Sequence, residues 1–156
     1  MNKSETVGRR YRNMNKRAVE RLRRYLLVEE PFAVYQGTEN AALRKLHEGL
    51  CEIYGIECVP ISFNRRSSPR YSVGRFNRHT PPLTPRGAKI FLCPASWPET
   101  VFVYLHEFRH HIQIVHDMKI DDIEKDANDW AESLFRLASP DLFERWVWRT
   151  RYLTWE

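Results

Sequence analysis

The order of hydrophobic periods along this chain is the feature that most limits the folds it can adopt. Apolar residues recur at helical spacing over residues 15–28 and 38–54, and again through the last third of the chain. Residues 56–63, 71–76 and 89–93 are short and rich in branched and aromatic side chains, with proline between them, which is typical of strands. The sequence therefore predicts an α+β fold, with a small three-stranded sheet packed by helices.

The last third of the chain is expected to form three helices. The first is opened by Ser96 or Pro98 and includes Thr100 to about residue 115. The second is capped by Asp121 or Asp122 and ends near residue 137. The third begins at Ser139 and Pro140, a cap followed by proline at the first helical position. The aromatic residues of this last helix and its tail either pack over the core or form a partner surface. They are Trp146, Trp148, Tyr152 and Trp155.

The net charge of +5 conceals an asymmetry between the two parts of the chain. Residues 1–89 carry a balance of +10, whereas residues 90–156 carry −5. Residues 1–24 hold nine basic and two acidic side chains, and residues 64–89 hold seven basic and no acidic ones. These two stretches predict either a surface that faces nucleic acid or an acidic protein, or a solvated face that keeps the protein in solution.

Three features indicate the compartment. No apolar run approaches the ~20 residues that a membrane-spanning helix needs, so no membrane partner is expected. The polar N-terminus lacks the apolar segment of a secretory signal. Cys51, Cys58 and Cys93 lack C-x-x-C spacing, which is typical of a reducing compartment and argues against a disulfide scaffold or a cysteine zinc finger. We therefore expect a cytoplasmic protein.

Residues 105–111 contain the pattern H-E-x-x-H inside a predicted helix. His106 and His110 lie about one turn apart on one helix face, so their imidazoles can bind one metal ion. Glu107 is rotated from them by about 100°, where it can take a proton from a metal-bound water. A zinc ion with about three protein ligands keeps an open position and activates that water. The motif predicts metal-assisted hydrolysis of an amide bond, with Glu107 as the general base.

The residues alone leave three possibilities for a third ligand. Asp126 and Asp129 share a face of the following helix, so one could ligate the metal while the other orients a histidine. Glu124 has a side chain one methylene longer than that of Asp126. His116 lies six residues after the motif, but a helix continuing through Gln113 would place it ~9 Å further along the axis. The third ligand is therefore Asp126, Glu124 or His116.

Three segments in this order resemble the ImmA/IrrE-like zinc metallopeptidases, a compact gluzincin type, over about residues 39–138. They are Lys89-Ile90-Phe91-Leu92, the H-E-x-x-H helix, and Glu124-Lys125-Asp126-Ala127-Asn128-Asp129-Trp130-Ala131. In that family the third segment typically reads Glu-x-Glu-Ala-x-x-Phe-Ala, and its second glutamate binds the metal. The resemblance implies zinc bound by His106, His110 and Asp126, a protein substrate, and a DNA-binding regulator as one such substrate.

This chain departs from the family pattern at two positions. Asp126 stands where the family has glutamate, so its shorter side chain would require a closer approach of the two helices. Arg109 stands where the family usually has a small residue, often glycine, and flanks the predicted metal face. We expect Arg109 to contact a substrate carbonyl or carboxylate, to pair with an acidic residue such as Asp129, or to extend to solvent.

Three functional hypotheses follow. The first is a zinc-dependent endopeptidase, a hydrolase in which residues 1–30 form a basic arm and helix and residues 31–156 form a metallopeptidase-like domain with an aromatic C-terminal helix. The second is a SprT-like protease associated with nucleic acid through residues 1–24 and 64–89, although that pattern prefers a histidine as third ligand. The third is a catalytically silent zinc-binding interaction module, in which Arg109 blocks the site.

Overall fold

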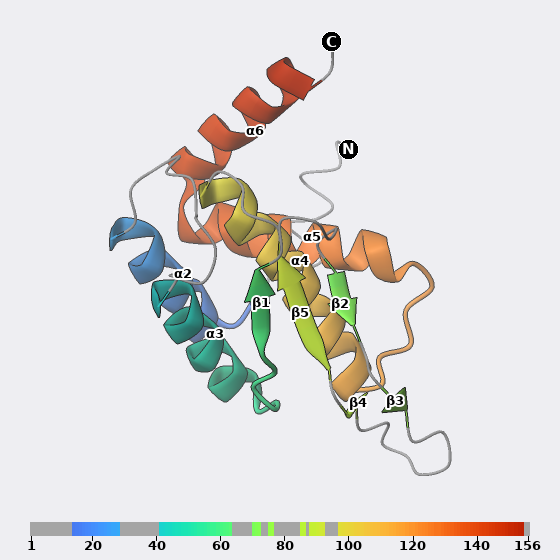
Figure 1. Ribbon diagram of the computed structural model, residues 1–156. Helices are drawn as coiled ribbons and strands as arrows, with labels where there is room; N and C mark the ends of the chain where they lie inside the picture. The colour runs from blue at the N-terminus through green and yellow to red at the C-terminus, as the bar shows by residue number, and fades with distance from the viewer. Residues whose placement is uncertain are drawn as a thin grey trace.

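The computed structural model describes residues 14–28, 41–63, 70–72, 75–76, 85–86, 88–92 and 97–154. In these ranges the protein is mostly helical with a small sheet, which is compatible with the expected α+β class (Figure 1). The described helices are α2 (Lys16–Val28), α3 (Ala41–Tyr54), α4 (Trp97–Val115), α5 (Ile123–Ala138) and α6 (Pro140–Thr154). The described strands are β1 (Ile61–Phe63), β2 (Arg70–Ser72), β3 (Arg75–Phe76), β4 (Pro85–Arg86) and β5 (Lys89–Leu92).

The sheet that carries the core has the order β1-β5-β2. β1 pairs with β5 in parallel, with Ile61 opposite Ile90, whereas β2 pairs with β5 antiparallel, with Tyr71 opposite Ile90. Ile90 and Leu92 are buried, while Lys89 and Phe91 alternate with them on the other face and are half-buried. This period of two is what a strand with one core-facing side requires.

Two of the strand predictions were wrong in extent. The single strand expected over residues 71–76 is divided between β2 and β3, because β2 pairs with β5 whereas β3 pairs with β4 in a separate two-stranded sheet. The strand expected over residues 56–63 is reduced to β1. Its first part instead closes the end of α3, where the amide of Ile56 donates to the carbonyl of Cys51. Most of the loop expected over residues 77–87 lies outside the described residues.

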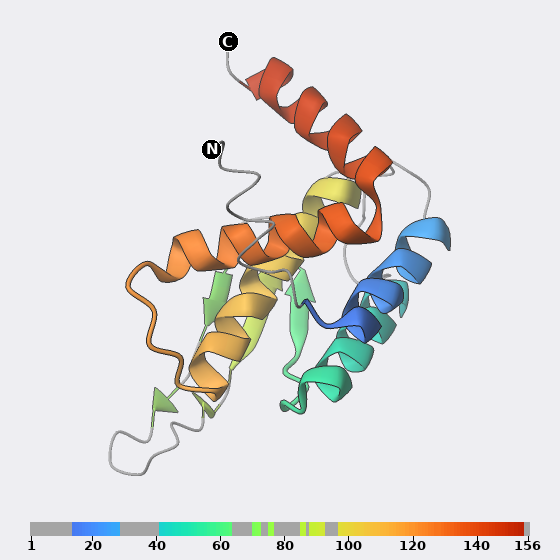
Figure 2. The same ribbon diagram turned by 180° about the vertical axis from the view of Figure 1, so that it is seen from behind.

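The helices are layered on one side of the sheet. α4 lies against the face that carries Ile90, and α5 crosses α4 on the side away from the sheet (Figures 1 and 2). α2 and α3 lie side by side next to β1 (Figures 1 and 2). The largest fully buried side chains come from all of these helices and from β5. They include Leu22, Leu50, Ile90, Tyr104, Phe108, Leu134 and Phe135.

The turn between α4 and α5 sets how the two helices meet. α4 ends with the amide of Met118 donating to the carbonyl of Gln113, and Asp117 takes a positive φ of 45°. Asp122 then caps α5, because its carboxylate accepts a hydrogen bond from the amide of Lys125. The chain thus reverses within a few residues, and the first turn of α5 lies beside the second half of α4.

α6 extends away from the rest of the molecule (Figure 1). Its first turns are anchored in the core, since Trp146 stacks on Phe135 and packs against Phe102, at ring-centroid distances of 6.0 and 4.7 Å. Of the C-terminal aromatic residues, Trp146 therefore packs over the core, whereas the side chains beyond residue 147 lie outside the described part. Among the described helices, none is long and apolar enough to cross a membrane.

Candidate metal centre

The H-E-x-x-H motif lies in the second half of α4. His106 and His110 occupy the same face one turn apart, and their Nε2 atoms approach to 3.1 Å. The two rings are nearly perpendicular, at 86°, with centroids 4.7 Å apart. His110 is 8% exposed and His106 is half-buried, so both rings are largely shielded while their Nε2 atoms point to one place.

The carboxylate of Glu124 lies at the same place. Its Oε2 is 3.0 Å from Nε2 of His106, and its Oε1 is 3.1 Å from Nε2 of His110. Glu124 is the second residue of α5, so the α4–α5 turn brings it beside the motif. Two imidazole nitrogens and one carboxylate therefore form a group that is geometrically able to bind a metal ion.

The spacing of these atoms fits a small divalent cation. Tetrahedral ligands at metal–nitrogen and metal–oxygen bonds of about 2.0–2.2 Å lie roughly 3.3 Å from one another. The three observed separations, 3.0, 3.1 and 3.1 Å, are close to this value. The Glu124 side chain is 66% exposed, so solvent reaches the group from its side.

Amide side chains hold both histidines from behind. Nδ1 of His106 donates to Oδ1 of Asn128 at 2.7 Å, and Nδ1 of His110 donates to Oε1 of Gln113 at 2.8 Å. An amide oxygen only accepts, so each ring carries its proton on Nδ1. The lone pair of each Nε2 is then directed to the shared point, as in metal sites whose histidines are oriented by a second hydrogen bond.

The structure does not bring Asp126 together with the histidines. Its Oδ2 accepts hydrogen bonds from Nε of Arg109 at 2.8 Å and from Nε2 of Gln113 at 2.9 Å, and the residue is only 1% exposed. Residues 124 and 126 are separated by about 200° around a helix, so they cannot face the same point. Glu124 takes the position beside the motif, and Asp126 points into the α4–α5 interface.

The other expected residues are placed as follows. Glu107 is 7% exposed, and its Oε1 lies 4.0 Å from Nε2 of His106, beside the site. His116 is exposed just beyond the end of α4 and does not join the group. Asp129 pairs with Lys125 at 2.8 Å, and Arg109 pairs with Asp126 at 2.8 Å.

The guanidinium of Arg109 lies at the interface between α4 and α5. Arg109 is 9% exposed, so of the three alternatives the one in which it extends to solvent is wrong, and it pairs with an acidic residue instead. Its guanidinium lies 5.6 Å from the centroid of the Trp130 ring, in addition to its ion pair with Asp126. Arg109 therefore connects α4 to the buried face of α5.

Sequence reasoning missed the roles of Asn128 and Gln113. A signal was present for each: Gln113 lies three residues after His110, and Asn128 lies four residues after Glu124, both at helical spacing. The distance between α4 and α5 was also needed, because Asn128 reaches His106 across the helix pair.

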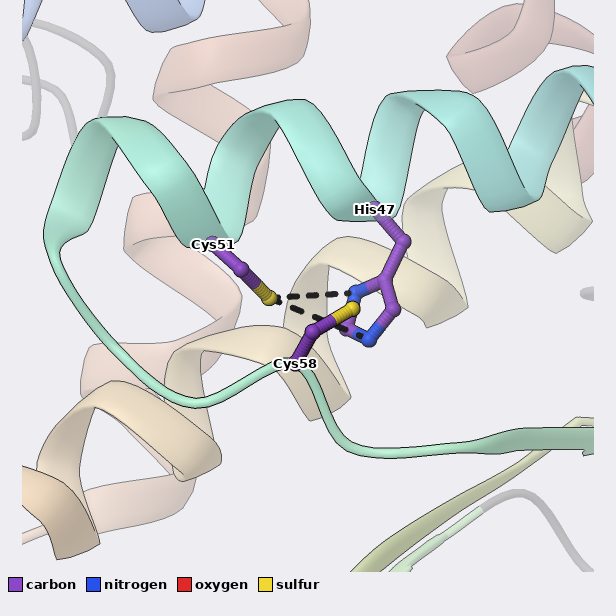
Figure 3. Close-up of side chains that lie close together, drawn as sticks. All are labelled: His47, Cys51 and Cys58. Atoms are coloured by element: carbon purple, nitrogen blue, oxygen red, sulfur yellow. Dashed lines mark hydrogen bonds between the residues drawn. The ribbon is translucent and has the colours of Figure 1, made fainter.

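A second cluster of side chains of metal-ligating type lies at the end of α3. It consists of His47, Cys51 and Cys58, whose donor atoms lie within 4.8 Å of one another (Figure 3). The spacing of these three residues in the sequence matches no metal-binding motif, because the two cysteines lack C-x-x-C spacing.

Comparison of the chain with protein-family models, with curated proteins and with solved structures gave no match. The functional argument for this protein therefore starts from the geometry of its own side chains.

Proposed function

We propose that this protein is a zinc-dependent endopeptidase that hydrolyses a peptide bond of a protein substrate. The observation that carries the proposal is the convergence of Nε2 of His106, Nε2 of His110 and the carboxylate of Glu124 within 3.1 Å. This donor set, two histidines and a glutamate, is one that zinc takes in catalytic sites with an open fourth position. In this proposal α4 is the active-site helix.

A bound zinc ion would polarise the carbonyl of the substrate peptide bond and lower the pKa of a water molecule. Glu107 lies one residue after the first histidine and beside its ring, where its carboxylate can take a proton from the attacking water and deliver it to the leaving amine. Asn128 and Gln113 hold the two imidazoles in one tautomer and one orientation throughout.

Arg109 distinguishes an active site from a blocked one. A catalytically silent zinc module would result if this side chain filled the open position. Its guanidinium is instead engaged by Asp126 and lies near Trp130, within the α4–α5 interface. This placement supports the peptidase over the silent module.

Two observations bear on the substrate and on the nucleic-acid alternative. The third donor beside the histidines is a carboxylate, whereas the SprT-like pattern prefers histidine. α2 carries part of the basic stretch 1–24, including the exposed Arg17 and Arg24. We keep a DNA-binding regulator as the proposed substrate, and a protease that itself binds nucleic acid as the second candidate.

A salt titration of binding to single-stranded DNA separates these two candidates. Binding that weakens steeply with salt would indicate phosphate contacts made by the protein itself.

The test of the peptidase combines metal analysis with one substitution. Purified protein reconstituted with zinc should hold about one zinc ion per chain. Glu107→Gln should keep that zinc and lose cleavage of a quenched fluorescent peptide library, whereas the control Glu99→Gln, an exposed change in the first turn of α4, should keep both. A protein without stoichiometric metal, or Glu107→Gln with undiminished cleavage, would contradict the proposal.

A further inference from the structure

Cys51 and Cys58 are brought together by the way α3 ends. Cys51 lies in the last turn of α3, and the amide of Gly55 donates to the carbonyl of Glu52. Gly55 takes a φ of 63°, the left-handed conformation that glycine adopts without strain at the end of a helix. The chain then turns back along α3, so that the thiol of Cys58 comes close to that of Cys51 (Figure 3).

His47 lies beside the two thiols, but both of its ring nitrogens are engaged by other partners. Its Nε2 donates to the carbonyl of Val59 at 2.6 Å, and its Nδ1 accepts from the hydroxyl of Tyr104 at 2.8 Å. Burial lowers the pKa of His47 to about 4, so the ring is neutral and has one donor and one acceptor nitrogen. Both nitrogens are therefore engaged, and neither offers a lone pair to a metal ion.

The position of Cys51 supports the same conclusion. Its sulfur is 3.8 Å from Nδ1 and 3.9 Å from Nε2 of His47, so it favours neither nitrogen. A metal ion shared by this ring and a thiolate would lie along the lone pair of one nitrogen. Without the imidazole, the cluster reduces to a pair of thiols, one buried and one exposed.

We propose that Cys51 and Cys58 form a reversible intrachain disulfide when the protein meets a peroxide. The exposed Cys58 thiolate attacks one oxygen of hydrogen peroxide, the O–O bond breaks, and water leaves after protonation, which gives a sulfenic acid. Cys51 then attacks the sulfur of Cys58, the S–O bond breaks, and a second water leaves. Two thiols lose two electrons to one peroxide, and a dithiol reductant reverses the step.

The residues around Cys51 and Cys58 set how fast the two thiols are oxidised. Burial raises the pKa of both thiols, and the carboxylate of Glu48 adds to the rise at each. A hydrogen bond from Cys51 acts in the opposite direction on the pKa of Cys58, but the net effect there is still a rise. Tyr104, whose pKa burial raises well above its ordinary value, and the neutral His47 bring no positive charge to the pair. Thiolate is therefore scarce near neutral pH, and oxidation speeds up as the pH rises toward 9.

The experiment maps the thiols of the full chain. Reduced protein is treated with hydrogen peroxide at about pH 8.5, alkylated in denaturant, and digested after glutamate. Cleavage at Glu52 and Glu57 places the two cysteines on different peptides, so a disulfide appears as two joined peptides that dithiothreitol separates. Cys93→Ser should keep the joined pair, and Cys58→Ser should lose it.

Two further results decide the proposal. Cys51 is only 2% exposed, so the polar replacement Cys51→Ser is made together with the apolar replacement Cys51→Ala. The far-ultraviolet circular dichroism of each variant is compared with that of the wild type to check that the variant is folded. Both thiols still free after peroxide in the wild-type protein, or joined only to Cys93 or to another chain, would overturn it. So would a metal ion that protects both thiols and is lost in Cys58→Ser. The peptidase proposal stands or falls separately, because none of these readouts uses the site on α4.

Discussion

Nε of Arg109 donates a 2.8 Å hydrogen bond to Oδ2 of Asp126, and the two side chains are only 11% and 2% exposed. The same Oδ2 accepts from Gln113, whose own carbonyl oxygen accepts from Nδ1 of His110. A buried ion pair between α4 and α5 is thus connected to a histidine of the candidate metal centre. Asp126 lies within the helix interface, and Glu124 lies at the surface beside the two histidines.

We expect Asp126→Ala to destabilise the protein by about 3–5 kcal/mol, because Arg109 would be left as a buried charge without its partner. Urea unfolding of the variant and the wild type measures the difference. The double variant Arg109→Leu, Asp126→Leu removes both charges and should lose clearly less. Equal losses in the single and double variants would show that the pair does not act as an ion pair.

Glu124→Ala should weaken zinc binding by more than about 100-fold, beyond the 10–100-fold typical of losing a supporting hydrogen bond. The reason is that it removes one of the three donors that meet beside the motif. Competition with a chromogenic chelator measures the affinity. The matched control is Asp129→Asn, which changes a carboxylate on the same helix that pairs with Lys125. Retained affinity in Glu124→Ala would indicate a different third ligand.

Asn128→Ala should weaken zinc binding by about 10–100-fold without unfolding the protein, because Nδ1 of His106 loses the oxygen that orients it. Asn128 is exposed, so the fold has little to lose. The same chelator competition measures the effect, and Asn128→Asp, which keeps an accepting oxygen, should restore most of the affinity. Asn128→Ala with the zinc affinity of the wild type would mean that the amide does not hold the ring.

The burial of His47 predicts that the free energy of unfolding decreases in acid. Burial lowers its folded pKa from 6.5 to about 4, so as the pH falls below 6.5 the unfolded chain takes up a proton that the folded chain refuses. Stability is full above pH 6.5, decreases through this window, and is lower by about 3 kcal/mol once both states are protonated.

Urea unfolding at several pH values between 4.5 and 7.5 checks this prediction. His47→Gln should have a shallower slope by about 1 kcal/mol per pH unit. His116→Gln, which changes an exposed histidine, should keep the wild-type slope. Parallel slopes in the wild type and His47→Gln would contradict the assignment.

Local patterns were enough to predict the helices. The expected helix over residues 15–28 corresponds to α2, and Asp122 caps α5 as one of the two expected residues. These features depend on neighbours within a turn, namely apolar spacing, a capping carboxylate and a proline at the first position. The strands were predicted less well, because the extent of β1 and the separation of β2 from β3 depend on pairing partners distant in sequence.

The sequence by itself determined that His106 and His110 share one face with Glu107 beside them, because helical spacing fixes side chains one turn apart. Only the tertiary structure decided which acidic residue completes the group. A donor must lie within about 3 Å of two imidazole nitrogens, and that distance depends on how α5 is rotated and positioned against α4. The turn over residues 116–122 sets both, so Glu124 meets the histidines and Asp126 meets Arg109.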